Sequence, residues 1–291
     1  MSASLGDSQL LLETIDDQQL FVRQNLPVAP AAVLVIVHGL GGHQGRYDYM
    51  TNYFVRHHVA VYRYDHRGHG QTPGPHGVYG DFNHFPDDLK TVVDWAKKNT
   101  PHLPIFVVGH SLGGGTAMAF GAKYPQTVNG IISVGALTRY HHQIFGPVRH
   151  FGDDETISGS FGDRSNSSAW MRQDYQDDPL NLTEIKGSLL NAAMDLVTFN
   201  RTHAADFVDP VLILHGAEDG VVSVTDSMDS YREISSRDKE LHIYPFLRHQ
   251  VLNEPSRRLA VYQEILDWMK KHGQINEKSA DWVHTSQLAF Y

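Results

Sequence analysis

The segment GHSLG at residues 109–113 places Ser111 between two glycines, in the pattern G-x-S-x-G. An apolar run precedes it and a helical pattern follows it, so we expect a tight turn from a strand into a helix. Glycine two positions to either side avoids clashes in such a turn, and the serine backbone is expected to be strained. The hydroxyl would then lie at a helix N-terminus, where negative charge is stabilised. The pattern favours a nucleophilic serine over an inert glycine-rich turn.

A serine hydroxyl is a weak nucleophile unless a base takes its proton and a carboxylate orients that base. In proteins with this turn, the acid and then the histidine follow the serine along the chain. Asp219 lies four residues after the apolar run 211–215, and His249 lies five residues after the run 240–244. Both positions fall at the carboxyl ends of expected strands, the edge where Ser111 also emerges. We therefore predict a catalytic triad of Ser111, Asp219 and His249.

Two other residues compete for these roles. Glu218 is next to Asp219 in sequence and is the rival acid. His242 is the rival histidine, but it lies within the expected strand rather than after it. The chain has 19 histidines, so any single histidine is weak evidence, whereas the ordered set of serine, acid and histidine is much stronger evidence.

The negatively charged oxygen that forms when serine attacks a carbonyl also needs hydrogen-bond donors. One donor is expected to be the backbone N–H of Leu112, the residue after the nucleophile. The second donor comes from a loop after an early strand, and the loop HGLGGH at 38–43 makes the N–H of Leu40 the candidate. Its glycines would let the backbone approach a substrate closely.

The elements that must position these residues alternate between strand-like and helix-like patterns. After a hairpin at 9–13 and 19–22, strands are expected at 32–37, 59–64, 105–109, 131–134, 211–215 and 240–244. Helical spacing marks 47–54, 89–96, 112–123, 185–197, 224–234 and 257–271. This alternation predicts an α/β protein with a mostly parallel central sheet flanked by helices.

Regular patterning is lost from about residue 138 to about residue 205, where the chain is polar with scattered aromatic residues. We predict that 138–205 is a cap inserted between two parts of one core, 1–137 and 206–273. The C-terminal tail, 274–291, has no clear pattern and receives no predicted role.

One helix-like stretch near the end of the insertion carries apolar side chains on a common face. Its members include Leu189, Leu190, Met194 and Val197. They could line a slot for an acyl chain and bind substrate, or they could simply pack on the core. The sequence does not separate the two, because a helix that lines a pocket and a helix that packs on a core have the same apolar periodicity. The many Asp, Asn and Ser residues of the insertion favour smaller or more polar esters over long-chain ones.

Composition excludes several classes of function. The 291-residue chain has ordinary globular composition and a formal charge of −9, without the basic cluster that nucleic-acid binding needs. It has no cysteine, which excludes disulfides, thiolate catalysis and cysteine-bound zinc. The longest apolar run, 31–37, is far short of the roughly 20 residues that cross a membrane. Because the N-terminus does not have the pattern of a signal peptide, we expect a cytoplasmic protein.

The loop DHRGHG at 65–70 could be mistaken for a metal site. It has none of the ligand spacings typical of zinc enzymes, so we interpret it as a structural loop whose charges connect neighbouring loops. No metal ion or other cofactor is predicted.

Six segments together resemble the α/β-hydrolases of the monoacylglycerol lipase and lysophospholipase group, which are serine aminopeptidase-like enzymes. They are HGLGGH (38–43), YDHRGHGQT (64–72), GHSLGGG (109–115), DDPL (177–180), ILHGAEDGVV (213–222) and RHQVLNEP (248–255). The segments run in family order within about residues 25–271. The resemblance implies the same triad, Leu40 and Leu112 as oxyanion donors, and a cap over the site. The cap is longer and more polar than is usual in the family, and a C-terminal tail follows the core.

The expected function is hydrolysis of carboxylic esters through an acyl-enzyme, with monoacylglycerol or a short lipid ester as the favoured substrate. A lysophospholipid comes close behind. A peptide or amide hydrolase with the same triad is an alternative, and so is a non-catalytic ligand-binding protein on the same scaffold. The expected partners are a small-molecule ester or lipid and, through the cap, transiently a membrane surface. The sequence leaves the oligomeric state open.

Overall fold

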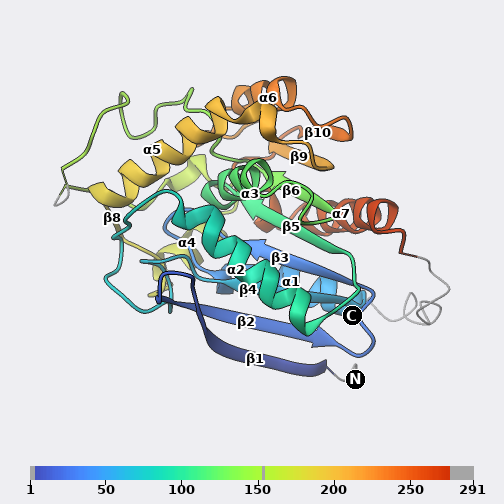
Figure 1. Ribbon diagram of the computed structural model, residues 1–291. Helices are drawn as coiled ribbons and strands as arrows, with labels where there is room; N and C mark the ends of the chain where they lie inside the picture. Colours follow the sequence, from blue (N-terminus) through green and yellow to red (C-terminus); the bar gives the residue numbers. More distant parts are fainter. Residues whose placement is uncertain (1–3, 153–154, 276–291) are drawn as a thin grey trace.

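The computed structural model describes residues 4–152 and 155–275, and an eight-stranded sheet forms its centre (Figure 1). The strand order is β1-β2-β4-β3-β5-β6-β9-β10. The strands are β1 (Ser4–Glu13), β2 (Gln19–Pro27), β3 (Ala32–Val37), β4 (Val59–Tyr64), β5 (Ile105–His110), β6 (Gly130–Val134), β9 (Val211–Gly216) and β10 (Lys239–Tyr244). Every strand expected from the sequence is present.

The sheet is mixed but mostly parallel. The first two strands form the expected antiparallel hairpin, and β2 pairs antiparallel with β4. The remaining neighbours, from β4 through β3, β5, β6 and β9 to β10, all pair in parallel. The inner parallel strands are buried along their whole length, as their continuous apolar sequences require. The predicted α/β fold is confirmed.

Helices cover both faces of the sheet. On one face, side chains of α2 (His84–Asn99) and α3 (Leu112–Lys123) pack in one apolar cluster. A side chain of α6 (Val224–Glu233) packs against the same cluster. On the other face, α1 (Asp48–Arg56) and α7 (Arg258–Gly273) pack in a second cluster. Short 3₁₀ helices lie at Gln44–Tyr47, Gly162–Arg164, Ala204–Asp206 and Val251–Asn253. The parallel strands therefore end at one common edge between these two helical layers.

The segment between β6 and β9 adds no strand to the central sheet. It holds the short pair β7 (Thr156–Ser158) and β8 (Glu184–Lys186), together with α4 (Ala169–Asp177) and α5 (Gly187–Thr202). The expected helix is α5, which begins at Gly187 rather than at 185. The sequence analysis missed α4, because Met171 is its only fully buried residue and it has little apolar periodicity.

Two other expectations concern the ends and the surface of the chain. Apart from residues 274 and 275, the predicted tail lies outside the described residues. Among the helices that the structure describes, each is too short or too polar to cross a membrane. The division into 1–137, 138–205 and 206–273 stays a prediction about domains.

Candidate active site

The turn between β5 and α3 holds Ser111 in a strained backbone conformation. Its φ is 58° and its ψ is −119°, a region that costs an L-residue about 1–3 kcal/mol. A Cβ on Gly109 would lie 2.1 Å from the carbonyl oxygen of Gly113, and one on Gly113 would lie 2.2 Å from that of Val37. No side chain fits at either position, so both glycines of the G-x-S-x-G pattern are required by close backbone packing. The predicted tight strand-to-helix turn is present.

The loops after β9 and β10 bring Asp219 and His249 together. The Nδ1–H of His249 donates to Oδ2 of Asp219 over 2.7 Å, with both side chains almost completely buried. The turn after β6 lies against this pair, since a Cβ on Gly135 would lie 3.4 Å from Nδ1 of His249. The hydrogen bond to Asp219 keeps a proton on Nδ1 of His249 and leaves Nε2 as the nitrogen that exchanges protons with a substrate or with Ser111.

Asp219 is held ionised by an unusually complete set of donors. Its Oδ1 accepts the backbone N–H groups of Val221 and Val222, at 2.8 and 2.9 Å. Its Oδ2 lies 3.1 Å from Nε2 of His215 as well as contacting His249. Burial alone would raise the pKa of Asp219, but the charge of His249 and these hydrogen bonds outweigh it and hold the pKa below its usual range. An ionised carboxylate is what a histidine base needs for orientation.

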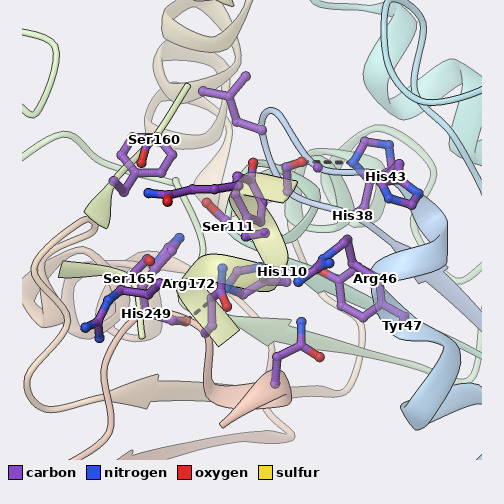
Figure 2. A pocket seen from close by; sticks show the side chains of 18 of the residues that line it. His38, His43, Arg46, Tyr47, His110, Ser111, Ser160, Ser165, Arg172 and His249 are labelled. Atoms are coloured by element: carbon purple, nitrogen blue, oxygen red, sulfur yellow. Dashed lines mark hydrogen bonds between the residues drawn. The ribbon is translucent and has the colours of Figure 1, made fainter. Parts of the chain in front are cut away.

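Ser111 and His249 line the same cavity (Figure 2). Neither Oγ of Ser111 nor Nε2 of His249 makes a hydrogen bond within the part of the chain that the structure describes. Such contacts are often loose without substrate and shorten in the reacting complex. The geometry therefore brings the three predicted triad residues to one site, with the acid–base contact already formed.

The loop 38–43 lies directly against Ser111. A Cβ on Gly39 would lie 3.1 Å from Cβ of Ser111, and Leu40 lines the cavity. The backbone N–H of Leu40 donates no hydrogen bond within the described residues. The N–H of Leu112 is the first of α3, where N–H groups have no partner inside the helix. Both predicted oxyanion donors are therefore unused by the fold, although the side chain of Leu112 packs in the interior.

Buried histidines hold this loop in place. The N–H of Gly41 donates to Nε2 of His69 over 3.2 Å, and the N–H of His66 donates to Nε2 of His38 over 2.9 Å. Both acceptor rings must be neutral to take these hydrogen bonds. Burial, the main cause, lowers the pKa of His69 to about 4 and that of His38 well below its usual value. The expected structural role of the 65–70 loop agrees with this geometry.

The cavity encloses about 690 Å³ including its open mouth. Its walls are loop 38–47, the loops of Ser111 and His249, and residues 160–176 of the predicted cap. The predicted substrate-binding residues Leu189, Leu190, Met194 and Val197 are elsewhere: they pack in a buried apolar cluster that also contains Leu112. Among the described residues none of the four lines this cavity, and their contact with an acyl chain stays a prediction.

The cap segment that lines the cavity is tied to the loops on both sides of Ser111. On the oxyanion side, Asp178 accepts from His43 at 2.8 Å, and Asp174 lies 2.7 Å from Arg46. On the histidine side, the backbone N–H of Gln250 donates to the carbonyl of Ser165 over 2.8 Å.

Sequence reasoning found the DDPL segment at 177–180 only as a family match. The wall at 160–176 was not predicted, and its only signal in the sequence is two arginines and three aromatic residues in a polar stretch. Val148 and Trp170 of the predicted cap are exposed, at 70% and 65%, and the membrane contact that they could serve also stays a prediction.

The rival residues are used differently. Glu218 is exposed beside Asp219, and His242 lies on β10, where it pairs with Glu264. The structure therefore pairs His249 with Asp219 and leaves both rivals outside the cavity.

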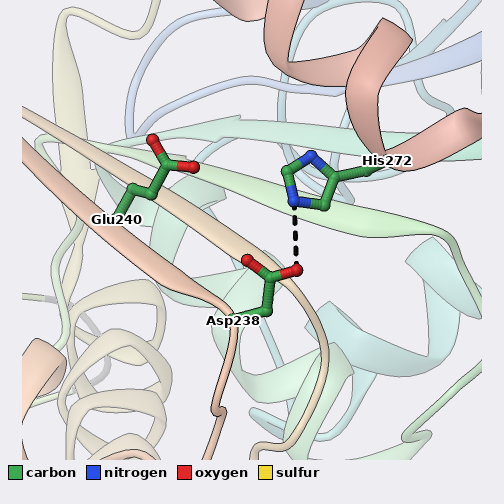
Figure 3. Close-up of side chains that lie close together, drawn as sticks. All are labelled: Asp238, Glu240 and His272. Carbon is green, nitrogen blue, oxygen red and sulfur yellow. Dashed lines mark hydrogen bonds and ion pairs between the residues drawn. The ribbon is translucent and has the colours of Figure 1, made fainter.

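One group in the described part of the chain has metal-like spacing: Asp238, Glu240 and His272 (Figure 3). It lies where β10 begins, at the end of the sheet opposite Ser111. Nε2 of His272 lies 3.2 Å from Asp238, and Glu240 lies 3.2 Å from Lys271. Ion pairing accounts for these contacts, and the cluster plays no part in the site around Ser111.

Comparison with known proteins identifies the family. Residues 28–256 match the family described as serine aminopeptidase, S33. A monoacylglycerol lipase of Mycolicibacterium smegmatis is 29% identical over 252 residues, which is 84% of this chain and 89% of that protein. A monoglyceride lipase of Mus musculus is also 29% identical, over 89% of each chain.

Solved structures agree on the fold. A soluble variant of the Saccharomyces cerevisiae monoglyceride lipase, in complex with a substrate analogue, superposes with a TM-score of 0.80 at 20% identity, covering 92% of this chain and 96% of that one. A thermostable carboxyl esterase of Bacillus coagulans, in complex with glycerol, gives the same TM-score and identity over 92% and 99% of the two chains.

Proposed function

The chain belongs to the serine aminopeptidase S33 family of α/β-hydrolases, and from that premise we propose that it hydrolyses carboxylic esters through an acyl-enzyme on Ser111. The observation that carries the proposal is the contact of 2.7 Å between Nδ1 of His249 and buried Asp219, at the edge where the strained Ser111 enters the same cavity. A ligand-binding scaffold has no need of an oriented base facing a strained serine.

The proposed reaction begins when Oγ of Ser111 attacks the ester carbonyl and Nε2 of His249 takes its proton. The tetrahedral intermediate collapses as His249 returns that proton to the leaving alkoxide, which departs as the alcohol. Water, deprotonated by His249, then attacks the acyl-enzyme, and His249 returns that proton to Oγ of Ser111 as the bond to the acyl group breaks and the carboxylic acid leaves. Asp219 keeps the imidazole in the correct tautomer and stabilises its charged form throughout. In acylation the proton comes from Ser111, in deacylation it comes from the attacking water, and His249 carries it in both.

The negative charge on the carbonyl oxygen is placed between the N–H groups of Leu40 and Leu112. Such donors stabilise the transition state more than the ground state, since the charge develops only during attack. Loop 38–43 is pre-organised for this by the hydrogen bond from Gly41 to His69, which needs no change during the reaction.

Monoacylglycerol is the first substrate class we propose, because two relatives that align over most of this chain are named monoacylglycerol or monoglyceride lipases. Polar side chains in the cavity wall, Ser160, Gln176 and Asn253, support an alcohol with free hydroxyl groups. Lysophospholipid hydrolysis is the second proposal, because its reaction is the same. An amidase acting through the same triad is the alternative within the enzyme class.

The test is the initial rate of hydrolysis of p-nitrophenyl esters from acetate to palmitate, measured beside Ser111→Ala. We expect turnover that vanishes in the variant, with a maximum at medium or long chains for a lipase. A maximum at acetate would indicate a small-ester esterase. Absence of Ser111-dependent turnover on every ester would refute the proposal and direct the search to amides and then to ligand binding.

A further inference from the structure

The charge of the cavity wall is opposite to that of the whole protein. The chain has 33 acidic against 24 basic residues, yet no aspartate or glutamate is among the described residues that line the cavity. Two arginines do line it, Arg46 and Arg172. In the view of Figure 2 they lie on opposite sides of Ser111, Arg46 with the oxyanion loop and Arg172 with His249.

The two arginines differ in how their charge is compensated. Arg46 lies 2.7 Å from Asp174 and 3.3 Å from Asp178, so two carboxylates of the predicted cap neutralise its charge. Arg172 has no carboxylate within 4.0 Å among the described residues. Its Nη1 donates to the backbone carbonyls of Asn166 and Ser167, at 2.8 and 3.0 Å.

The remaining donors of Arg172 are unused. Its Nε and Nη2 make no hydrogen bond to the described residues, although the side chain is only partly exposed. The nearby carboxylate of Glu254 is occupied instead by the hydroxyl of Ser167, at 2.8 Å. A guanidinium held by two carbonyls and left with free N–H groups is pre-organised to bind a planar or tetrahedral anion in a bidentate manner.

From this geometry we propose that Arg172 binds an anionic group of the substrate, so that the enzyme prefers esters carrying a phosphate or a carboxylate beside the scissile bond. The inference rests on the proposed ester hydrolysis and refines its substrate class. The anion can belong to the alcohol, as in an acylglycerol phosphate, or to the acyl group, as in a half-ester of a dicarboxylic acid. Both present the same chemistry to Arg172: at least two oxygens that share a negative charge.

Two matched substrate pairs distinguish these sources. The first pair is 1-hexanoylglycerol and 1-hexanoylglycerol 3-phosphate, and the second is p-nitrophenyl pentanoate and mono-p-nitrophenyl glutarate. We expect kcat/KM of the wild type to favour the anionic member of one pair by at least about tenfold, the size of one charge-assisted hydrogen bond. Arg172→Gln should abolish that preference by lowering kcat/KM on the anionic member more than on the neutral one, and Arg172→Lys should restore part of it.

Arg201→Gln is the matched control, because it removes the same charge from an exposed position on α5 and should leave the preference unchanged. Equal loss on neutral and anionic esters in Arg172→Gln would mean that Arg172 only holds the turn at residues 166–167, and would overturn the inference. So would a wild type without preference in either pair.

Binding to the Ser111→Ala variant separates this inference from the proposed function. Calorimetry with each ester in that background measures recognition without turnover. We expect tighter binding of the anionic member by at least about tenfold, lost when Arg172→Gln is added. If binding follows this pattern but the wild type hydrolyses no ester, the anion site is sustained and the proposed reaction is refuted. Equal affinities for both members would refute the anion site whatever the activity.

Discussion

The edge of the sheet and the cap segment 160–176 surround one cavity, but they place their side chains by different means. At the sheet edge, Ser111, Asp219 and His249 are at most 9% exposed. Backbone packing and backbone hydrogen bonds fix the turns that carry them. In the predicted cap, Arg172 is partly exposed and Gln176 is exposed, and both belong to a helix with one buried residue. From this difference we expect the core to determine the rate of the chemical step and the predicted cap to determine which substrates are preferred.

The cap is itself uneven. Its second helix, α5, is packed almost as tightly as the core: Asn200 donates to the carbonyl of Gly115 over 3.0 Å, and Leu190 is fully buried. The cavity wall comes instead from α4 and the irregular chain before it, which contact the core through polar and charged groups. We therefore expect substitutions to affect stability in α5 and substrate preference in α4.

The largest expected effect is on the core. Asp219→Asn keeps an oxygen for the N–H groups of Val221 and Val222 but presents an amide to His249, which favours the wrong tautomer. We expect kcat on any accepted ester to fall by about 10³–10⁴-fold, with little change in the thermal unfolding midpoint. Gln176→Ala on the cap wall should change kcat by far less. A comparable loss in the two variants would remove the distinction between core and cap.

The second prediction compares two arginines for stability. Arg67 donates to Asp88, which is 1% exposed, through Nε and Nη2 at 2.8 and 2.7 Å. Arg67→Ala leaves that carboxylate buried without its partner, so we expect a loss of about 3–5 kcal/mol in the free energy of unfolding, measured with urea. Arg149→Ala, which breaks an exposed ion pair with Glu155 in the cap, is the matched control and should have a much smaller effect. Similar losses of unfolding free energy in the two variants would contradict the difference between the buried ion pair of the core and the exposed one of the predicted cap.

Most of the fold of the core, and the placement of Ser111, Asp219 and His249 at one edge of the sheet, could be predicted from the sequence, because both have strong local signals. Buried parallel strands need continuous apolar runs, and the turn at Ser111 needs glycine at 109 and 113. The cavity wall could not be predicted, since α4 has no apolar stripe and is held by contacts between residues more than 100 positions apart, such as the ion pair of Asp174 with Arg46. The apolar stripe of α5 was visible, but periodicity cannot separate a core wall from a pocket wall.

The third prediction concerns that stripe. Leu190→Ala should destabilise the protein by about 2–5 kcal/mol, because it leaves a void in a fully packed cluster. From the packing, we expect the dependence of kcat/KM on acyl chain length to stay unchanged, whereas Gln176→Ala should alter KM without a stability loss. A shift toward longer acyl chains in Leu190→Ala would instead support the acyl slot predicted from the sequence.

The smallest expected effect is the contribution of each buried histidine to the pH dependence of the free energy of unfolding. Burial lowers the pKa of His66 and of His110 to about 3 and that of His69 to about 4, below the usual value of 6.5. Between these values the unfolded chain binds protons that the folded chain cannot, so stability rises with pH and is lost as pH falls below 6.5. Each such histidine contributes about 1.4 kcal/mol per pH unit in that window.

Urea unfolding between pH 7 and pH 5 measures this slope. His66→Gln removes one titrating group and should make the slope shallower by about 1 kcal/mol per pH unit on average over this range, because the unfolded histidine is only partly protonated near pH 6.5. Asp88 and Asp209, whose pKa values burial raises to about 6, contribute a slope of opposite sign, so the comparison with His66→Gln is the decisive one. An equal slope in the wild type and in His66→Gln would show that His66 is not held neutral.

Reaction with a fluorophosphonate, followed by intact mass and peptide mapping, tests the central claim most directly. The account predicts one adduct per chain on Ser111, no adduct in Ser111→Ala, and slower labelling in Asp219→Asn because the base is misoriented. Failure of the wild type to react, or an adduct that persists in Ser111→Ala, would contradict the assignment of Ser111 as an activated nucleophile.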